Sequence, residues 1–80
     1  MKNSKRAYIW RYIKLHGSIS SWEGFVFCHY MHTAGFMNEL KNKGVNIYTQ
    51  EEHGHNTKYT RYFISPEEIR KAEANKWVKY

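Results

Sequence analysis

Residues 33–64 read TAGFMNELKNKGVNIYTQEEHGHNTKYTRYFI, and the spacing of their apolar residues changes once along this stretch. In the first part, from about Thr33 to Lys43, apolar side chains recur at spacings of three and four residues. A glycine, Gly44, follows at once, and glycine in this place commonly ends a helix in the left-handed conformation. The pattern therefore predicts a helix whose apolar face is formed by Phe36, Met37 and Leu40.

After this helix the period drops to two, as in a strand. Residues 45–50 predict a strand in which Val45 and Ile47 share one face. Residues 59–64, which are mostly aromatic and β-branched, predict the strand that returns beside it. The residues between them, 51–58, are mostly polar and predict a hairpin loop.

A first helix is expected ahead of this stretch, over residues 4–16. Ile9, Trp10 and Ile13 fall on one of its faces, at helical spacing. Gly17 is suited to end it in the left-handed conformation.

A second helix is expected after a short extended segment. Residues 18–20 are too few for more than a strand stub. Ser20 and Glu23 have the capping-box spacing, in which each side chain bonds a free backbone N–H of the first turn. The apolar side of this helix would be formed by Trp22, Phe25 and Val26, and we predict a turn within residues 28–32.

A last helix is predicted over residues 65–80. Ser65 is suited to the cap, Pro66 to the first helical position and Glu68 to the capping-box position. Its apolar residues would be Ile69, Ala72, Trp77 and Val78.

The predicted order is helix, strand stub, helix, turn, helix, hairpin, helix. Three helices followed by a two-stranded hairpin form a winged helix, an α+β fold in which the second and third helices make a helix-turn-helix and the hairpin is the wing. We therefore predict one domain over residues 1–80, with the core and wing in 1–64 and an extra C-terminal helix in 65–80. Another small α+β arrangement is the alternative.

Charge and composition indicate the kind of partner. The 80 residues include 13 Lys and Arg against 7 Asp and Glu, a net charge of +6 that suggests an anionic partner, with nucleic acid the first candidate. Aromatic residues make up 18% of the chain, too many for a disordered segment. A single cysteine, Cys28, allows no internal disulfide and favours a reducing compartment. Because no apolar run approaches the roughly 20 residues that span a bilayer, we expect a cytoplasmic protein with no membrane partner.

Two segments resemble small phage and prophage winged helix-turn-helix proteins. Residues 15–24, LHGSISSWEG, match the turn before the second helix of such proteins, and residues 38–47, NELKNKGVNI, match the end of the recognition helix. The aromatic strand over residues 58–64 also fits, so that the resemblance covers roughly residues 7–64. It implies a DNA-binding regulator or accessory factor.

Such a protein would bind double-stranded DNA through its third helix, its wing and its basic first helix. Residues 1–16 carry five cations and no acid, which suits a phosphate backbone. Asn38 is suited to read an adenine. The expected contact residues are Lys5, Arg6, Arg11, Thr33, Asn38, Lys41, Asn42, Lys43, Asn56 and Lys58. A lone domain of this size is also expected to form a homodimer or to bind DNA cooperatively.

Four residues favour an alternative in which the scaffold binds a protein. His32 and Phe36 stand where proteins of this kind tend to carry arginines, and the hairpin carries Glu51 and Glu52. The alternative is an inhibitor of a bacterial nucleic-acid machine, such as a host polymerase or a CRISPR defence complex (an anti-CRISPR). Its interface would include Tyr30, His32 and Phe36, because aromatic anchors are enriched in protein interfaces.

Catalysis and metal binding are not expected. The chain has no Asp, no phosphate-binding loop, no paired-carboxylate motif and no nucleotide fingerprint. One cysteine is too few for a structural zinc site, which usually has at least two. We therefore expect no enzyme, no catalytic residues, no metal and no cofactor.

Overall fold

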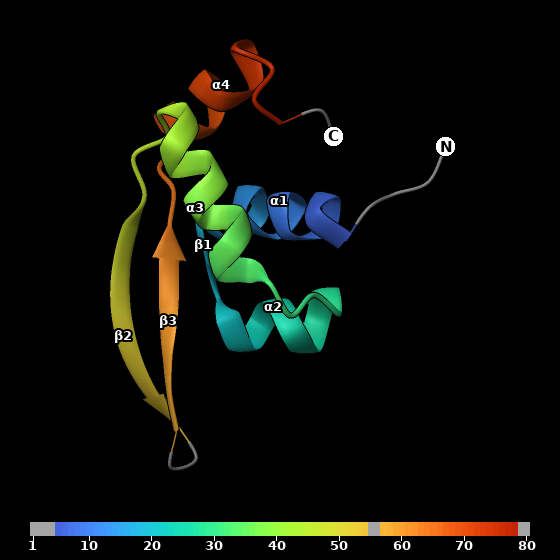
Figure 1. The fold of residues 1–80 in the computed structure, drawn as a ribbon, viewed down its shortest axis with the longest axis vertical. Helices are drawn as coiled ribbons and strands as arrows, with labels where there is room; N and C mark the ends of the chain where they lie inside the picture. The colour runs from blue at the N-terminus through green and yellow to red at the C-terminus, as the bar shows by residue number, and fades with distance from the viewer. Residues whose placement is uncertain (1–4, 55–56, 79–80) are drawn as a thin grey trace.

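The computed structural model describes residues 5–54 and 57–78, and in them four helices pack around a three-stranded sheet (Figure 1). The helices are α1 (Lys5–His16), α2 (Ser21–Cys28), α3 (Thr33–Lys43) and α4 (Pro66–Ala74). The strands are β1 (Ser18–Ser20), β2 (Tyr48–Gly54) and β3 (Thr57–Phe63). The predicted winged-helix architecture is confirmed.

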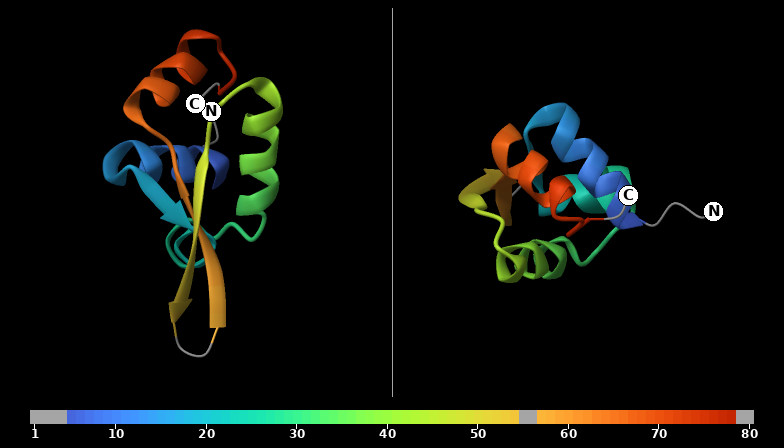
Figure 2. Two further views of the ribbon diagram at one scale, coloured as in Figure 1. Left: turned by 90° about the vertical axis from the view of Figure 1, so that its left-hand side faces the viewer. Right: turned by 90° about the horizontal axis from the view of Figure 1, so that it is seen from above.

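The sheet is antiparallel, with β3 in the centre. Phe63 of β3 lies opposite Ser18 of β1 on one side and opposite Tyr48 of β2 on the other. Since β1 has only three residues, β2 and β3 continue past it as a two-stranded hairpin that projects from the helices (Figure 2). This hairpin, the β2–β3 pair, is the wing.

The wing is paired further toward its tip than the sequence predicted. Pairing reaches Gly54 opposite Thr57, so most of the loop predicted for residues 51–58 is strand. The prediction was wrong because polarity does not separate a loop from a two-stranded ribbon, both faces of which are open to water. The predicted contact residue Asn56 lies outside the described residues.

At its base the wing starts later than predicted, at Tyr48 and not at Val45. The backbone N–H of Val45 donates to the carbonyl of Leu40 at 3.0 Å and so belongs to the end of α3. Gly44, in the left-handed conformation with φ of 117°, makes this turn possible. Val45 and Ile47 both pack on the core, although the connection that carries them is irregular. Their alternation with polar neighbours therefore resembles the pattern of a strand.

The predicted helix starts at Ser20 and Ser65 are confirmed. Ser20 Oγ accepts from the Glu23 N–H at 3.0 Å, and the Glu23 carboxylate accepts from the Ser20 N–H at 2.9 Å, which completes a capping box. Ser65 Oγ accepts from the Glu68 N–H at 3.3 Å. The Glu68 carboxylate instead accepts from the Asn46 N–H at 2.9 Å, and it thereby ties α4 to the base of the wing.

The predicted apolar side of α2 is wrong, because Trp22, Phe25 and Val26 are exposed. The buried residues of α2 are the small Gly24 and Cys28. A Cβ built on Gly24 would come within 2.3 Å of Thr33 Oγ1, so α2 and α3 approach each other across a residue without a side chain. A hydrophobicity pattern assigns the largest side chains to the core, whereas this contact selects the smallest one.

The last helix is shorter than predicted and ends at Ala74. Trp77 and Val78 nevertheless pack against the core, since the chain turns back at Lys76, which has a φ of 58°. The Trp77 N–H donates to the carbonyl of Ala72 at 2.9 Å and fixes this turn. The rest of the core comes from every helix and from the strands, and its largest fully buried side chains are Trp10, Ile9, Ile13, Ile19, Met37, Leu40 and Ile64. In the part of the chain that the structure describes, no helix has the length and apolarity needed to cross a membrane.

Candidate nucleic-acid interface

Helix α3 presents a polar face to solvent and an apolar face to the core. Phe36, Met37 and Leu40 are buried, and each is at most 2% exposed. Figure 2 shows α3 beside the start of β2, with the wing extending past it. The remaining surface of α3 includes four of the predicted contact residues, all exposed: Asn38, Lys41, Asn42 and Lys43. Two amide side chains and two cations therefore lie on one rigid helix next to the wing.

Two other residues predicted for contact are buried. Thr33 and Phe36 are each 2% exposed. Thr33 faces Gly24 of α2, and Phe36 lies beneath Arg6, whose guanidinium carbon is 5.2 Å from the centre of the ring. Burial of both side chains does not favour the predictions that Thr33 contacts DNA and that Phe36 anchors a protein partner.

Arg6 of α1 is held against α3 by a carboxylate. Its guanidinium donates to both oxygens of Glu39, at 2.6 and 2.9 Å, and its Nε donates to the hydroxyl of Tyr30 at 3.1 Å. The hydrogen bonds from Arg6 lower the pKa of the Glu39 carboxyl, so Glu39 stays ionised at neutral pH. The two charges offset each other, which leaves Arg6 less available to a phosphate than the sequence suggested.

The residues proposed for a protein interface form no exposed cluster. Tyr30 is half-buried and bonded to Arg6, and its ring meets that of His32 edge-on with 5.9 Å between the centres. His32 is exposed at the start of α3. With Phe36 buried and Tyr30 half-buried, His32 is the one of the three that is exposed.

The wing carries an ion cluster at its base, in which two carboxylates share one arginine. Arg61 of β3 donates to Glu52 of β2 and to Glu23 of α2, both at 2.9 Å, and to Ser18 Oγ at 3.1 Å. Burial raises the pKa of the Glu23 carboxyl, but hydrogen bonds from Ser20, Tyr12 and Arg61 outweigh burial and lower it. Glu52 is thus paired toward the body of the domain, whereas Glu51 is exposed on the wing.

A comparison with protein families identifies the family that has this arrangement of a helix-turn-helix and a wing. The family model of the winged helix-turn-helix domain matches residues 4–67. The chain belongs to this family. Comparison with curated proteins and with solved structures gave no match. In this winged helix-turn-helix domain α2 and α3 form the helix-turn-helix, and membership of the family suggests DNA binding.

The remaining predicted cations of the winged helix-turn-helix domain lie on different elements. Lys5 and Arg11 are exposed on α1, and the guanidinium of Arg11 lies 6.0 Å from the centre of the Tyr8 ring. Lys58 is exposed on β3, opposite His53 of the wing. Their contact with DNA stays a prediction. Arg6 is the α1 cation whose side chain bonds to α3.

Sequence reasoning missed the partners of these charges. Glu39 and Arg61 were not singled out as charge partners. Arg6 and Glu39 are separated by 33 positions in the sequence and Glu23 and Arg61 by 38, and ion pairs over such separations leave no local pattern. Glu23 was identified through its capping box, and that signal does not reveal its second bond to Arg61.

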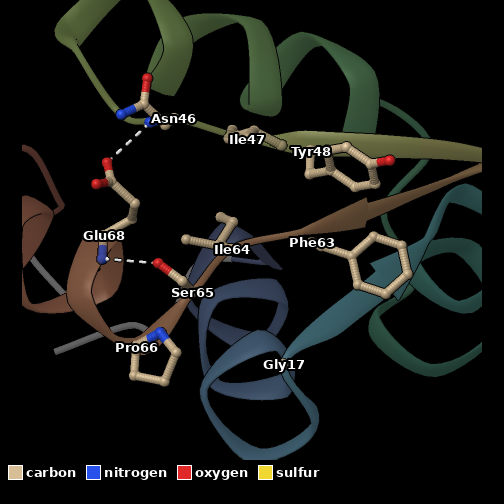
Figure 3. Close-up of a pocket in the computed structure, with 9 residues that line it drawn as sticks. All are labelled: Gly17, Asn46, Ile47, Tyr48, Phe63, Ile64, Ser65, Pro66 and Glu68. Carbon is tan, nitrogen blue, oxygen red and sulfur yellow. Dashed lines mark hydrogen bonds between the residues drawn. The ribbon is translucent and has the colours of Figure 1, made fainter.

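A hollow of about 590 Å³ lies where the base of the wing meets α4 (Figure 3). Its lining is largely apolar and includes Gly17, Ile47, Tyr48, Phe63, Ile64 and Pro66. Its carboxylate, Glu68, is bonded to the backbone of Asn46, and this bond lowers the pKa of Glu68. The hollow offers apolar walls around a carboxylate that already has a structural partner.

The described residues contain no group of three or more His, Cys, Asp or Glu that could hold a metal ion. The thiol of Cys28 is buried, and burial raises its pKa. It therefore stays protonated at neutral pH, in the form that is a poor nucleophile.

Proposed function

We propose that this winged helix-turn-helix domain binds double-stranded DNA with α3 in the major groove and the wing beside it. The observation that carries the proposal is the exposed face of α3, where Asn38, Lys41 and Asn42 stand on a helix fixed by its buried apolar face. An asparagine on such a helix is suited to bond an adenine edge, and lysines to bond phosphates. The role we propose is that of a small regulator or accessory factor of phage type, acting in the bacterial cytoplasm.

Charge supports this proposal. The chain has a net charge of +6, and its acids are largely used in ion pairs, such as Glu39 with Arg6 and Glu23 and Glu52 with Arg61. Exposed cations such as Lys41 and Lys58 then add a field that attracts a polyanion. We propose that Lys41 contacts a phosphate and that Arg6 supports α3 through Glu39.

The alternative considered from the sequence, a protein-binding inhibitor, depended on an aromatic anchor at Phe36. Since Phe36 is buried, that observation no longer favours it. DNA binding is the function that the exposed face of α3 supports best.

The test is a fluorescence-anisotropy titration of a random-sequence duplex at low and near-physiological salt. The domain should bind, and the logarithm of its association constant should fall linearly with the logarithm of salt concentration. Lys41→Ala should weaken binding and reduce the salt slope by about 0.9, the value for one phosphate contact in duplex DNA.

A matched control is Arg70→Ala, which removes an exposed cation from α4. Arg70 lies beside Ile13 and Lys14 of α1, away from the polar face of α3. Arg70→Ala should leave the slope unchanged. Equal effects of the two variants, or no binding of the wild type at low salt, would refute the proposed interface.

A further inference from the structure

Helix α2 exposes four large apolar side chains to solvent: Trp22 (54% exposed), Phe25 (50%), Val26 (37%) and Phe27 (62%). We call these four residues the α2 patch. They make up half of an eight-residue helix. Exposed apolar surfaces of this kind mark interaction sites in folded proteins, because water contact with them is unfavourable.

The α2 patch is held in place by the contacts of α2 with the rest of the domain, and it lies outside the proposed DNA interface. The buried residues of α2 are Gly24 and Cys28, and Gly24 faces α3. Figure 1 shows α1 and α3 on one side of α2, with the other side uncovered by any described element. The ring of Phe27 stacks on Tyr12 of α1, with 6.0 Å between centres and 13° between planes. The patch is therefore a fixed surface whose contact leaves the polar face of α3 free.

The α2 patch carries no unpaired charge. Glu23 is the one charged residue of α2, and its carboxylate is bonded to Arg61, Tyr12 and the Ser20 N–H. A two-fold contact brings a surface against its own copy, so a charge near the two-fold axis would lie close to the same charge of the other chain. An apolar patch without charge meets this requirement.

We infer that the α2 patch is the interface of a homodimer, with a second copy of this chain as its occupant. An aromatic side chain has about 150–250 Å² of surface, so three rings that are about half exposed offer roughly 300 Å² per chain. Two copies would bury about 600 Å² of aromatic surface. Since non-polar atoms make up about 60% of a typical interface, the whole contact would reach at most about 1,000 Å², the lower limit for a specific interface.

The net charge gives this dimer a distinctive salt dependence. Two chains of +6 repel each other at long range, and salt screens that repulsion. Dimerisation should therefore strengthen with salt, whereas binding to DNA weakens with it. The dimer is also measured without DNA, so its failure and the failure of the proposed function are separate results.

The experiment is sedimentation velocity of the full chain without DNA, from about 1 to about 300 µM. The mass should rise from the 9.7 kDa of one chain toward twice that value as concentration increases. Raising salt from about 0.1 to about 0.5 M should shift the transition to lower concentration. Trp22→Glu and Phe27→Glu should each shift it at least tenfold toward higher concentration, as expected for aromatic residues inside an interface.

The matched control is Tyr48→Glu, which places the same charge on a more exposed aromatic position of β2. It should dimerise as the wild type does. Circular dichroism and thermal unfolding establish that each variant is folded, and the dilution series of the wild type gives a result that depends on no variant. A wild type that stays monomeric over the whole range overturns the inference, and so does a folded Trp22→Glu and Phe27→Glu pair that dimerises like Tyr48→Glu.

Discussion

Replacing Gly24 by alanine should destabilise the helix-turn-helix, although alanine is the better helix former. The new Cβ would lie 2.3 Å from Thr33 Oγ1, far inside van der Waals contact. Thr33 is 2% exposed and β-branched, so its side chain has little room to turn aside. Overpacking a buried contact costs about 1–3 kcal/mol, and the gain in helix propensity offsets about 0.5–1 kcal/mol of that.

The expected net loss is therefore about 1–2 kcal/mol of unfolding free energy. In a domain of this size 1 kcal/mol corresponds to about 4–8 °C in Tm, so the Tm should fall by roughly 5–15 °C. The assay is thermal unfolding followed by circular dichroism. Gly35→Ala is the control, because a Cβ on this exposed α3 glycine meets nothing within 4 Å. That variant should be as stable as the wild type or more stable.

A rescue variant identifies the contact itself. In Gly24→Ala/Thr33→Ala the nearest remaining atom is the Cβ of residue 33 at 3.5 Å, an ordinary contact distance. Thr33 Oγ1 is buried and has no hydrogen-bond partner among the described residues, so little is lost with it. The double variant should recover most of the lost Tm. A Gly24→Ala protein as stable as the wild type, or a double variant as unstable as Gly24→Ala, would refute this account of the α2–α3 contact.

Three further predictions concern ion pairs and the core. Arg6 lowers the pKa of Glu39, so the ion pair stabilises the fold above pH 4.5, the ordinary pKa of this carboxyl, and the stabilisation is lost as pH falls through the lower pKa of the folded state. Glu39→Gln should therefore flatten the acid side of a plot of Tm against pH. An acid side that is unchanged in this variant would contradict the ion pair. Arg61→Gln leaves the partly buried Glu23 and Glu52 without their cation and should cost about 2 kcal/mol in urea unfolding, whereas a loss of a few tenths would show that the cluster does not hold the wing. Leu40→Ala removes a side chain that is 1% exposed and should cost about 2–5 kcal/mol in the same assay, while Lys41→Ala beside it should cost less than about 0.5 kcal/mol.

Local signals in the sequence were sufficient for the helix starts and for the order of the elements. Ser20 with Glu23, and Ser65 with Pro66, specify caps by chemistry that acts within four residues. The apolar spacing of α3 and the glycine after it fixed the bounds Thr33–Lys43 that the structure has. These features need no information from the rest of the chain.

The errors arose where a distant contact decides the outcome. Pattern alone placed Trp22 and Phe25 in the core, but the contact of Gly24 with Thr33 turns the small side of α2 inward. Phe36 was predicted for the apolar face of α3 and, in the alternative, for a protein interface; the structure buries it, with Arg6 packed over its ring. Burial of one helix face is set by which neighbour packs on it, and that neighbour is not adjacent in sequence.

The predicted cations were on the surface, but the charges available to a partner were not predictable. Arg6 and Lys41 look alike in the sequence, whereas in the structure Arg6 is paired with Glu39 and Lys41 is exposed. Such pairs join elements that only the fold brings together.

The central claim, that the exposed face of α3 binds DNA, is tested most directly by nuclear magnetic resonance. Backbone amide resonances of the ¹⁵N-labelled chain would be followed during titration with duplex DNA at low salt. The account predicts that the largest shifts fall on residues 38–43 of α3 and on the wing, with small shifts on α2. Shifts concentrated on α2, or none anywhere at saturating DNA, would contradict it.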